Sequence, residues 1–278
     1  MLAVIALIAA LQAPPPAPPA PPAPPAPAPP PAAAPAPAPA PGLPPGVNPC
    51  RDPALALQCP DLVMGAPADL QVDRTPSRRV LLHMENAIVN VGNGPAELFG
   101  VRSGPREMAA SQVIGDAAGV RRRYPTGAQV YYTSVPARGG DYWKMDDAAR
   151  FELYAMQPDG SRGALVRVGP KLRYCLRDLD RVRDWQRVPP RRVFGACSQS
   201  ASKQEVTLGT SVGWADVYPA AYPGNWIEVT ALRGCFVVVH RADPERHIFE
   251  ISEANNTSAK TVRLPFRAGP QGCPAYRP

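Results

Sequence analysis

Apolar and polar residues alternate in short runs through most of the chain after Cys59. The clearest runs cover 78–92, 149–156 and 257–266, and turn-forming pieces such as VGNGP, QPDGSRG and YPGN lie between the runs. Successive side chains of a strand point to opposite faces, so this alternation predicts half-buried strands, and no long apolar stripe with helical spacing competes with them. The pattern predicts an all-β domain, an antiparallel β-sandwich that extends from Cys59 to Phe266.

Two segments sharpen this fold prediction because they resemble strand and turn pieces of immunoglobulin-like modules. They are IVNVGNGPAEL at 88–98 and ADPERHIFEISEANNTSAKTVRL at 242–264, where an Asn-rich turn would connect two edge strands. The resemblance concerns architecture and implies no chemistry.

The first 49 residues differ from the rest in composition. Residues 1–13 form a short apolar run ending in small residues, which is typical of a signal peptide; because no Lys or Arg precedes it, an uncleaved N-terminal membrane tether is the alternative. Residues 14–49 are almost wholly Pro and Ala, cannot bury a core, and predict a stiff, polyproline-like linker. The folded domain is therefore assigned to residues 50–278.

The six cysteines favour disulfides over a metal site. They are even in number, contain no CxxC pair and belong to a chain predicted to be exported, either secreted or held at a bacterial cell surface. Six cysteines allow 15 pairings. Local spacing favours Cys50 with Cys59 and Cys175 with Cys197, which leaves Cys235 for Cys273.

The net charge of +7 and the pI near 9.3 are compatible with two kinds of surface. One binds an extracellular or cell-envelope ligand, for which an anionic polymer is a candidate, and the other is simply solvated. Nucleic acid is not an expected partner, because aromatic residues do not interleave with the basic ones as base stacking requires.

Ionisable residues give few conventional site motifs. The only histidines are His83 and His240, inside strand patterns, and His247, in a polar turn, so packed or solvated imidazoles are expected rather than metal ligands. No serine-hydrolase elbow, P-loop or HExxH motif is present. Lys171 stands out as a lone lysine beside Cys175 in a segment otherwise predicted as buried strand; its amine is expected either to reach solvent from a strand end or to belong to a site.

Five segments, in this order and spacing, resemble the bacterial branch of the lysyl oxidase family. They are GPKLRYCLRD at 169–178, FGACSQ at 194–199, LGTSVGWADVYP at 208–219, NWIEVTAL at 225–232, and the segment at 242–264. The resemblance implies a copper-dependent amine oxidase that releases aldehyde, ammonia and hydrogen peroxide. Its copper ion would be held by three histidines in an HxHxH run, and its quinone cofactor would form by cross-linking a lysine to an oxidised tyrosine.

The resemblance assigns the quinone-precursor positions to Lys171 and Tyr218, which are both present. It places the copper run directly before the strand that starts at Ala149, where this chain reads GGDYWKM, so Gly140, Tyr142 and Lys144 occupy the positions of the three histidines. Glycine offers no ligand, a phenol has a pKa near ~10, and an ammonium repels a cation, so this degenerate set should hold no copper. Without copper, Lys171 and Tyr218 are expected to stay ordinary side chains.

The resulting functional hypothesis is a catalytically inactive lysyl-oxidase-like domain that serves as an extracellular binding or structural module without cofactors. The alternative is a working copper amine oxidase whose ligands come from elsewhere in the chain. If the assignment is right, Lys171 and Tyr218 should lie side by side near one mouth of the sandwich, with Tyr142 and Lys144 close by. Lys171 is then expected to be a buried amine with a pKa shifted toward neutrality.

Overall fold

The structure, a computed structural model, describes residues 37–40, 47–135, 140–184, 187–267 and 272–278. The predicted signal peptide or tether, 1–13, and most of the linker, 14–49, lie outside the described residues. The described residues belong to one unit, Pro37–Pro278. Among them, no helix has the length and hydrophobicity that a membrane crossing requires.

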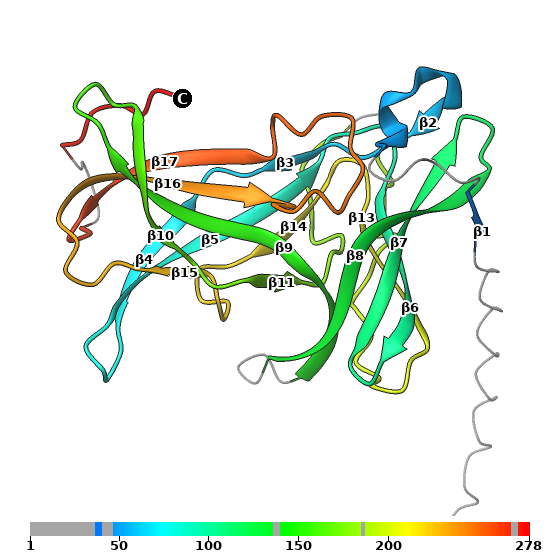
Figure 1. The fold of residues 1–278 in the computed structure, drawn as a ribbon, viewed down its shortest axis with the longest axis horizontal. Coiled ribbons are helices and arrows are strands. Elements are labelled where there is room, and N and C mark those ends of the chain that lie inside the picture. Colours follow the sequence, from blue (N-terminus) through cyan, green and yellow to red (C-terminus); the bar gives the residue numbers. More distant parts are fainter. Residues whose placement is uncertain (1–36, 41–46, 136–139, 185–186, 268–271) are drawn as a thin grey trace, which may run out of the picture. The chain divides into compact units, whose positions relative to one another are not determined.

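The larger of two sheets has eleven strands among the described residues (Figure 1). Its main order is β13 (Glu205–Thr210), β6 (Ala96–Gly104), β7 (Glu107–Asp116), β8 (Arg121–Val135), β9 (Gly140–Met156), β16 (Gly234–Ala242) and β17 (Thr257–Leu264), all antiparallel neighbours. Four short strands join this order: β1 (Ala38–Pro39) on β8, β2 (Leu57–Gln58) on β7, and both β10 (Arg162–Val168) and β11 (Leu172–Tyr174) on β9.

The smaller sheet is built around β5 (Val80–Asn90), whose side chains alternate between buried and half-buried along most of its length, as its sequence predicts. The other strands of this sheet are β12 (Asp180–Arg181), β14 (Trp214–Tyr218), β15 (Trp226–Glu228), β3 (Leu62–Met64) and β4 (Ala68–Arg74). Two short 3₁₀ helices, η1 (Pro49–Arg51) and η2 (Pro53–Leu55), are the only helices among the described residues; each has Pro at its start and an Asn or Asp cap before it.

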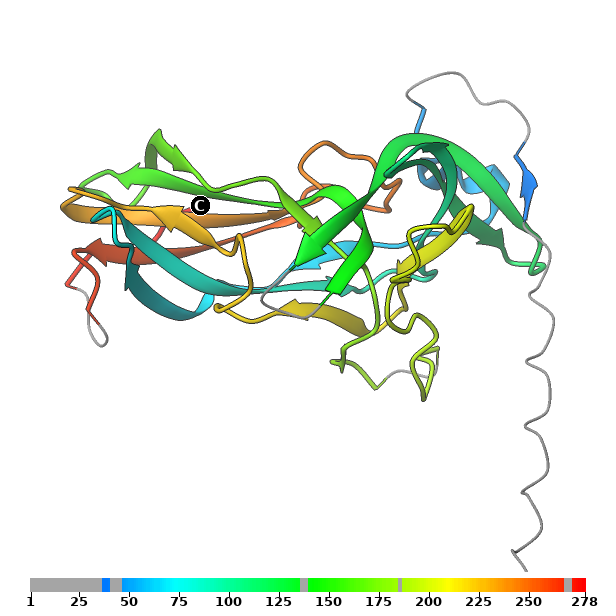
Figure 2. The same ribbon diagram turned by 90° about the horizontal axis from the view of Figure 1, so that it is seen from below.

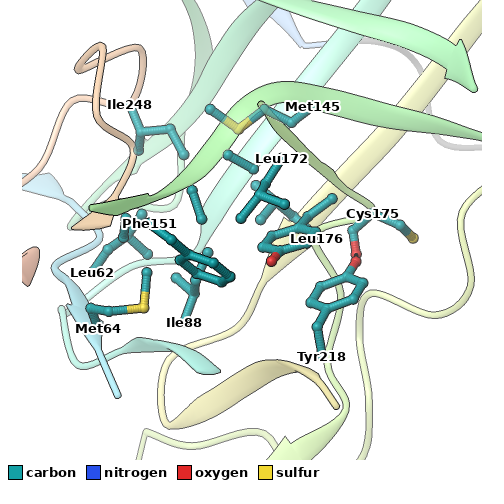
Figure 3. Packing of buried hydrophobic residues seen from close by; sticks show 14 of the residues in the cluster. Leu62, Met64, Ile88, Met145, Phe151, Leu172, Cys175, Leu176, Tyr218 and Ile248 are labelled. Atoms are coloured by element: carbon teal, nitrogen blue, oxygen red, sulfur yellow. Dashed lines mark hydrogen bonds between the residues drawn. The ribbon is translucent and has the colours of Figure 1, made fainter. Parts of the chain in front are cut away.

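The hydrophobic core lies between the layer of β9, β16 and β17 and the layer of β3 and β5, which face each other in Figure 2. Leu82, Phe151 and Val238 are fully buried and represent both layers. Figure 3 shows the part of this core where Tyr218 and Cys175 meet the aliphatic side chains. The predicted all-β, antiparallel sandwich is confirmed.

Strand β9 is long because it joins two halves of the larger sheet. Its first half pairs with β8 and its second half with β16, and the register of β11 shifts between Met145 and Ala149. Asp147 has a φ of +47° within this irregular stretch, which marks a bulge. The expectation that the strand begins at Ala149, behind a loop, was wrong: the GGDYWKM stretch is itself strand from Gly140 onward.

All three predicted disulfides are formed. Cys50 is bonded to Cys59, Cys175 to Cys197 and Cys235 to Cys273, with Cα atoms 5.7 to 5.8 Å apart. The Cys175–Cys197 bridge closes the Arg-rich and Pro-rich segment that follows β11. Such bridges are typical of an oxidising, extracellular environment.

Two described pieces of the Pro/Ala-rich linker contact the domain. Ala38–Pro39 form β1, parallel to β8, and the Ala40 amide donates to the carbonyl of Arg123 at 2.9 Å. Pro49 is buried at the start of η1. Pro lacks an N–H, so in this alternating Pro–Ala stretch the alanines supply the donors for pairing.

Candidate functional site

The first half of β9 contributes one face to the candidate site and the other to the core. Period-2 alternation places Gly140, Tyr142 and Lys144 on one face of the strand and Trp143 on the other. Trp143 is fully buried, and its indole N–H donates to the carbonyl of Ser200 at 3.0 Å. The sequence therefore anchors the strand with the tryptophan and presents to the opposite side the three positions at which the resemblance would expect histidines.

Tyr142 and Lys144 line a cavity of about 210 Å³. The remaining lining residues come from the segment after β11 and from β14 and the turn that follows it: Cys175, Arg177, Val217, Tyr218, Pro219 and Tyr222. We call this cavity the Lys144 pocket. Its polar groups are three phenols, one amine and one guanidinium.

Three tyrosines form one wall of the site. Tyr218 stacks on Tyr174 with ring centroids 3.8 Å apart, and the Tyr222 ring meets Tyr218 edge-on at 4.6 Å. The Tyr218 hydroxyl donates to the Cys175 carbonyl at 3.1 Å, and the Tyr174 hydroxyl donates to Oδ1 of Asn225 at 2.8 Å. Burial is the largest cause of the raised pKa of both Tyr174 and Tyr218, so both phenols stay protonated at neutral pH.

A turn after β14 positions Tyr222. The Tyr222 amide donates to the Pro219 carbonyl at 2.8 Å, and the Asn225 amide donates to the Tyr222 carbonyl at 3.0 Å. The Asn225 side chain also donates to the carbonyls of Tyr218 and Pro219, both at 3.3 Å. The predicted YPGN turn thus folds Tyr222 back over the pocket.

Lys144 is a buried amine without an ion-pair partner among the described residues. Lys144 is only 3 % exposed, and its Nζ donates a hydrogen bond to the Tyr222 hydroxyl at 2.9 Å. Burial, the largest cause, and the positive charge of Arg173 together lower the pKa of Lys144 from 10.5 to about 8, against a smaller opposing effect of Asp141. A lysine is seldom buried unless it is paired, so this amine distinguishes the site.

Arg177 brings a second positive charge to the pocket. The Nε atom of this half-buried residue is buried and has no hydrogen-bond partner in the structure. Asp216 lies within electrostatic range, but burial raises the pKa of its carboxyl well above the usual value, which outweighs the lowering effect of Arg177. Lys144 and Arg177 are thus the two cationic side chains that line the pocket.

Lys171 differs from its predicted state. It lines a neighbouring cavity of about 320 Å³, which shares Lys144 and Tyr222 with the Lys144 pocket. Its side chain is 65 % exposed and its Nζ pairs with Asp147 at 2.5 Å, so the hydrogen bond and the charge of Asp147 raise its pKa. The expectation of a buried Lys171 with a pKa near neutrality was wrong, and Lys144 is the buried amine instead.

Lys171 and Tyr218, which the resemblance assigns to a quinone cofactor, therefore have different partners. Tyr218 is bonded to the Cys175 carbonyl, whereas Lys171 is paired with a carboxylate on the far side of the Lys144–Tyr222 pair. Tyr142, Lys144 and Tyr218 do meet in one pocket, as the resemblance predicts. Lys171 lines a different cavity from Tyr218, so the structure does not bring these two side chains together in one pocket, contrary to the expectation that they lie side by side.

Gly140, Tyr142 and Lys144, at the positions where the resemblance would expect histidines, do not fit a copper ion. They offer a phenol and an ammonium, and a Cβ built on Gly140 would lie 2.2 Å from Nε2 of Gln199, so a larger side chain there would require Gln199 to move. Within the part of the chain that the structure describes, no group of three His, Cys, Asp or Glu residues could hold a metal ion. His240 is buried against Phe151 with ring centroids 4.0 Å apart, and burial lowers its pKa to about 3.

A larger cavity of about 870 Å³ lies elsewhere, around Phe194 and Val212. Its two lining carboxylates are paired with arginines: Glu97 with Arg121 at 2.5 Å, and Asp116 with Arg122 at 3.7 Å. The smaller Lys144 pocket is lined by a buried lysine that forms no ion pair with the described residues and by three phenols, so we assign the candidate site there.

Comparison with models of known protein families found none that matches this chain, and comparison with characterised proteins found no similar sequence. The site is therefore defined by its own geometry. It is a small pocket of a disulfide-linked β-sandwich, walled by tyrosines and lined by Arg177 and by a buried lysine that forms no ion pair with the described residues.

Proposed function

We propose that this chain is an exported lysyl-oxidase-like domain that has lost copper-dependent amine oxidation and acts outside the cell as a binding module. The observation that carries the proposal is the Lys144 pocket, in which a buried, unpaired lysine meets the phenols of Tyr142, Tyr218 and Tyr222. A polar cavity lined by few convergent groups is the usual form of a small-ligand site. These groups occupy the place that copper and the quinone would have in an active relative.

The alternative function, a working copper amine oxidase, has less support from the same residues. It would need copper ligands near β9 and a lysine free to react with Tyr218. The β9 face carries glycine, a phenol and an amine, and the Lys171 amine is held by Asp147 at 2.5 Å. The proposed binding role uses the groups that are present.

Charge favours an anionic ligand. Lys144 and Arg177 both line the pocket, and the chain as a whole has a net charge of +7. Anionic polymers of a bacterial cell envelope would be attracted to such a surface and would be placed within reach of a secreted or tethered domain. The three disulfides suit that environment.

The proposal is tested by loading the oxidised, full-length protein with Cu(II) and measuring hydrogen peroxide released from 1,5-diaminopentane and from a lysine-rich peptide. We expect no peroxide beyond that of the copper-free protein. Lys171→Met is the matched control, because it removes the lysine that a quinone would require. Amine-dependent peroxide that disappears in Lys171→Met would overturn the proposal in favour of an active oxidase.

The binding role has its own measurement. Purified bacterial cell walls should retain the protein at low salt and release it at high salt, and retention should weaken in Arg177→Gln. A protein that does not bind walls at any ionic strength would remove the anionic polymer as the partner.

A further inference from the structure

The Lys144 amine has the environment of a nucleophile. It is buried, it forms no ion pair with the described residues, and it adjoins two cavities, of about 210 and 320 Å³. The Tyr222 hydroxyl lies 2.9 Å from Nζ, and the ring centroids of Tyr222 and Tyr142 lie 5.5 and 6.0 Å from it. A lysine that is desolvated and placed near other cations is activated as an amine, since the neutral form is the one that attacks carbonyl carbons.

The size of the pocket limits what can reach this amine. Its volume of about 210 Å³ is below the range of about 300–1,000 Å³ that is typical of sites for drug-sized ligands. At about 30 Å³ for each water molecule in the liquid, it has room for roughly seven waters. A molecule of a few carbon atoms, or a single anionic group presented by a polymer, fits this space, whereas a long polymer segment does not.

The second positive group of the pocket selects a charged ligand. The Arg177 guanidinium lines the same cavity, and its Nε has no hydrogen-bond partner in the structure. A planar guanidinium binds carboxylates through paired N–H groups. A carbonyl compound that also carries a carboxylate would therefore satisfy both Lys144 and Arg177.

We infer that Lys144 is a carbonyl-binding residue, whose amine forms a reversible imine with a small aldehyde acid or 2-oxo acid held by Arg177. The inference rests on the proposed function, because it names the ligand class of the same pocket. In the reaction, Nζ attacks the carbonyl carbon and gives a carbinolamine, the C–O bond then breaks, and a C=N bond forms. The carbonyl oxygen leaves as water with the two hydrogens of the amine, so no oxidant or reductant is required.

Two tyrosines complete the chemistry. The Tyr222 phenol, already bonded to Nζ, is placed to pass a proton to the departing hydroxyl and to regain one from the amine. The Tyr142 phenol lines the same pocket and can donate to the bound carbonyl oxygen. Arg173 and Asp141 are the charged groups that act on the Lys144 amine, Arg177 and Lys171 line the two cavities beside it, and the pKa of Lys144, about 8, leaves a fraction of neutral amine at physiological pH.

The chain offers a clean test because it contains only four lysines: Lys144, Lys171, Lys203 and Lys260. The disulfide-bonded protein is incubated at pH 7 with glyoxylate and sodium cyanoborohydride, which converts an imine irreversibly into carboxymethyl-lysine, and each lysine is quantified by peptide mass spectrometry. With a pKa near 8, about one Lys144 amine in ten is neutral at pH 7, against about one in 3,000 for an ordinary lysine. Allowing for restricted access, we expect Lys144 to be modified at least about tenfold faster than each other lysine.

Matched variants separate the two parts of the inference. Lys144→Arg keeps the positive charge and should abolish the fast modification, while Lys203→Arg should leave it unchanged. Arg177→Gln should slow modification by glyoxylate at least about tenfold but change the reaction with acetaldehyde little, because only glyoxylate carries a carboxylate. Melting curves and disulfide mapping verify that each variant folds.

The outcomes are distinct from those of the peroxide assay. If all four lysines are modified at equal rates, or if Lys144 is modified only after unfolding, the inference of an imine at Lys144 is wrong. The proposed binding function is unaffected by that result. Equal rates for glyoxylate in wild type and Arg177→Gln overturn the role of Arg177. Amine-dependent peroxide from copper-loaded protein would overturn the proposed function, whatever Lys144 does.

Discussion

Replacing Lys144 by methionine should stabilise the domain at neutral pH. The lysine is 3 % exposed, and its pKa falls from 10.5 to about 8 mainly because burial disfavours the charged form. A shift of that size means that the charged amine destabilises the folded state by about 3 kcal/mol at pH values where Lys144 is protonated. Methionine has similar length and no charge. Losing the hydrogen bond to Tyr222 costs about 1 kcal/mol, so the net gain is about 2 kcal/mol at pH 7.

The gain should depend on pH in a defined direction. The pKa of Lys144 is lower in the folded state than in the unfolded state, so between pH 8 and pH 10.5 the unfolded wild-type chain binds more protons than the folded one. The free energy of unfolding of the wild type therefore rises with pH in that window. The variant lacks this term. The stability difference between Lys144→Met and wild type should therefore be largest below pH 8 and vanish near pH 10.

Urea unfolding followed by tyrosine and tryptophan fluorescence at pH 7, 8, 9 and 10 measures this difference. A gain of about 2 kcal/mol should raise the melting temperature by about 4–8 °C at pH 7 in a domain of this size. Lys171→Met is the control: its amine is 65 % exposed and pairs with Asp147, so the change should stay within about 1 kcal/mol. Equal or lower stability of Lys144→Met at pH 7, with no pH-dependent difference, would refute the conclusion that Lys144 is a buried, unpaired amine.

Two further predictions concern the framework of the site. Removing the Cys175–Cys197 bridge by replacing both residues with alanine should cost about 3 kcal/mol, because the bridge closes a loop across a sequence separation of 22 residues; a loss below about 1 kcal/mol in urea unfolding would show that the loop is held by other contacts. Glu250 accepts hydrogen bonds from the Leu62 amide and from Asn256, and burial raises its pKa to about 9. Its stabilising effect is complete below its unfolded pKa and is lost as pH rises toward 9, so Glu250→Gln should be more stable than wild type at pH 9 by at least about 1 kcal/mol; identical pH slopes from 5 to 9 would contradict this.

Alternation along the chain was sufficient to predict the sandwich, since side-chain period identifies a strand wherever one face is buried. It missed β7, whose sequence EMAASQVIGD is rich in small and polar residues and has few β-branched ones. It also placed the start of β9 too late, because Tyr142, Trp143 and Lys144 interrupt the expected pattern of small and apolar residues. The structure shows that both faces of this part of β9 are covered, so alternation carries little information there.

The site was predicted in part. Local spacing was enough for the disulfides, and the resemblance brought Tyr142, Lys144 and Tyr218 together. The states of the two lysines followed from contacts that no local pattern reveals: Asp147 holds Lys171 through a bulge in β9, and Tyr222 covers Lys144 from a turn about 80 residues later in the chain. The YPGN sequence predicted the turn that carries Tyr222. The direction in which this turn projects depends on the pairing of β14 with β5, which the local sequence does not reveal.

The central claim is that Lys171 and Tyr218 remain separate side chains in a domain that no longer oxidises amines. Mass spectrometry of the protein after exposure to Cu(II) and air tests it most directly. We predict an intact mass equal to that of the sequence less two hydrogens for each of the three disulfides, with Lys171 and Tyr218 recovered in separate peptides after reduction and digestion. A heavier protein, because forming a lysine-linked quinone adds one oxygen atom and removes four hydrogens, with a peptide in which Lys171 is joined to Tyr218, would contradict the account and identify an active oxidase.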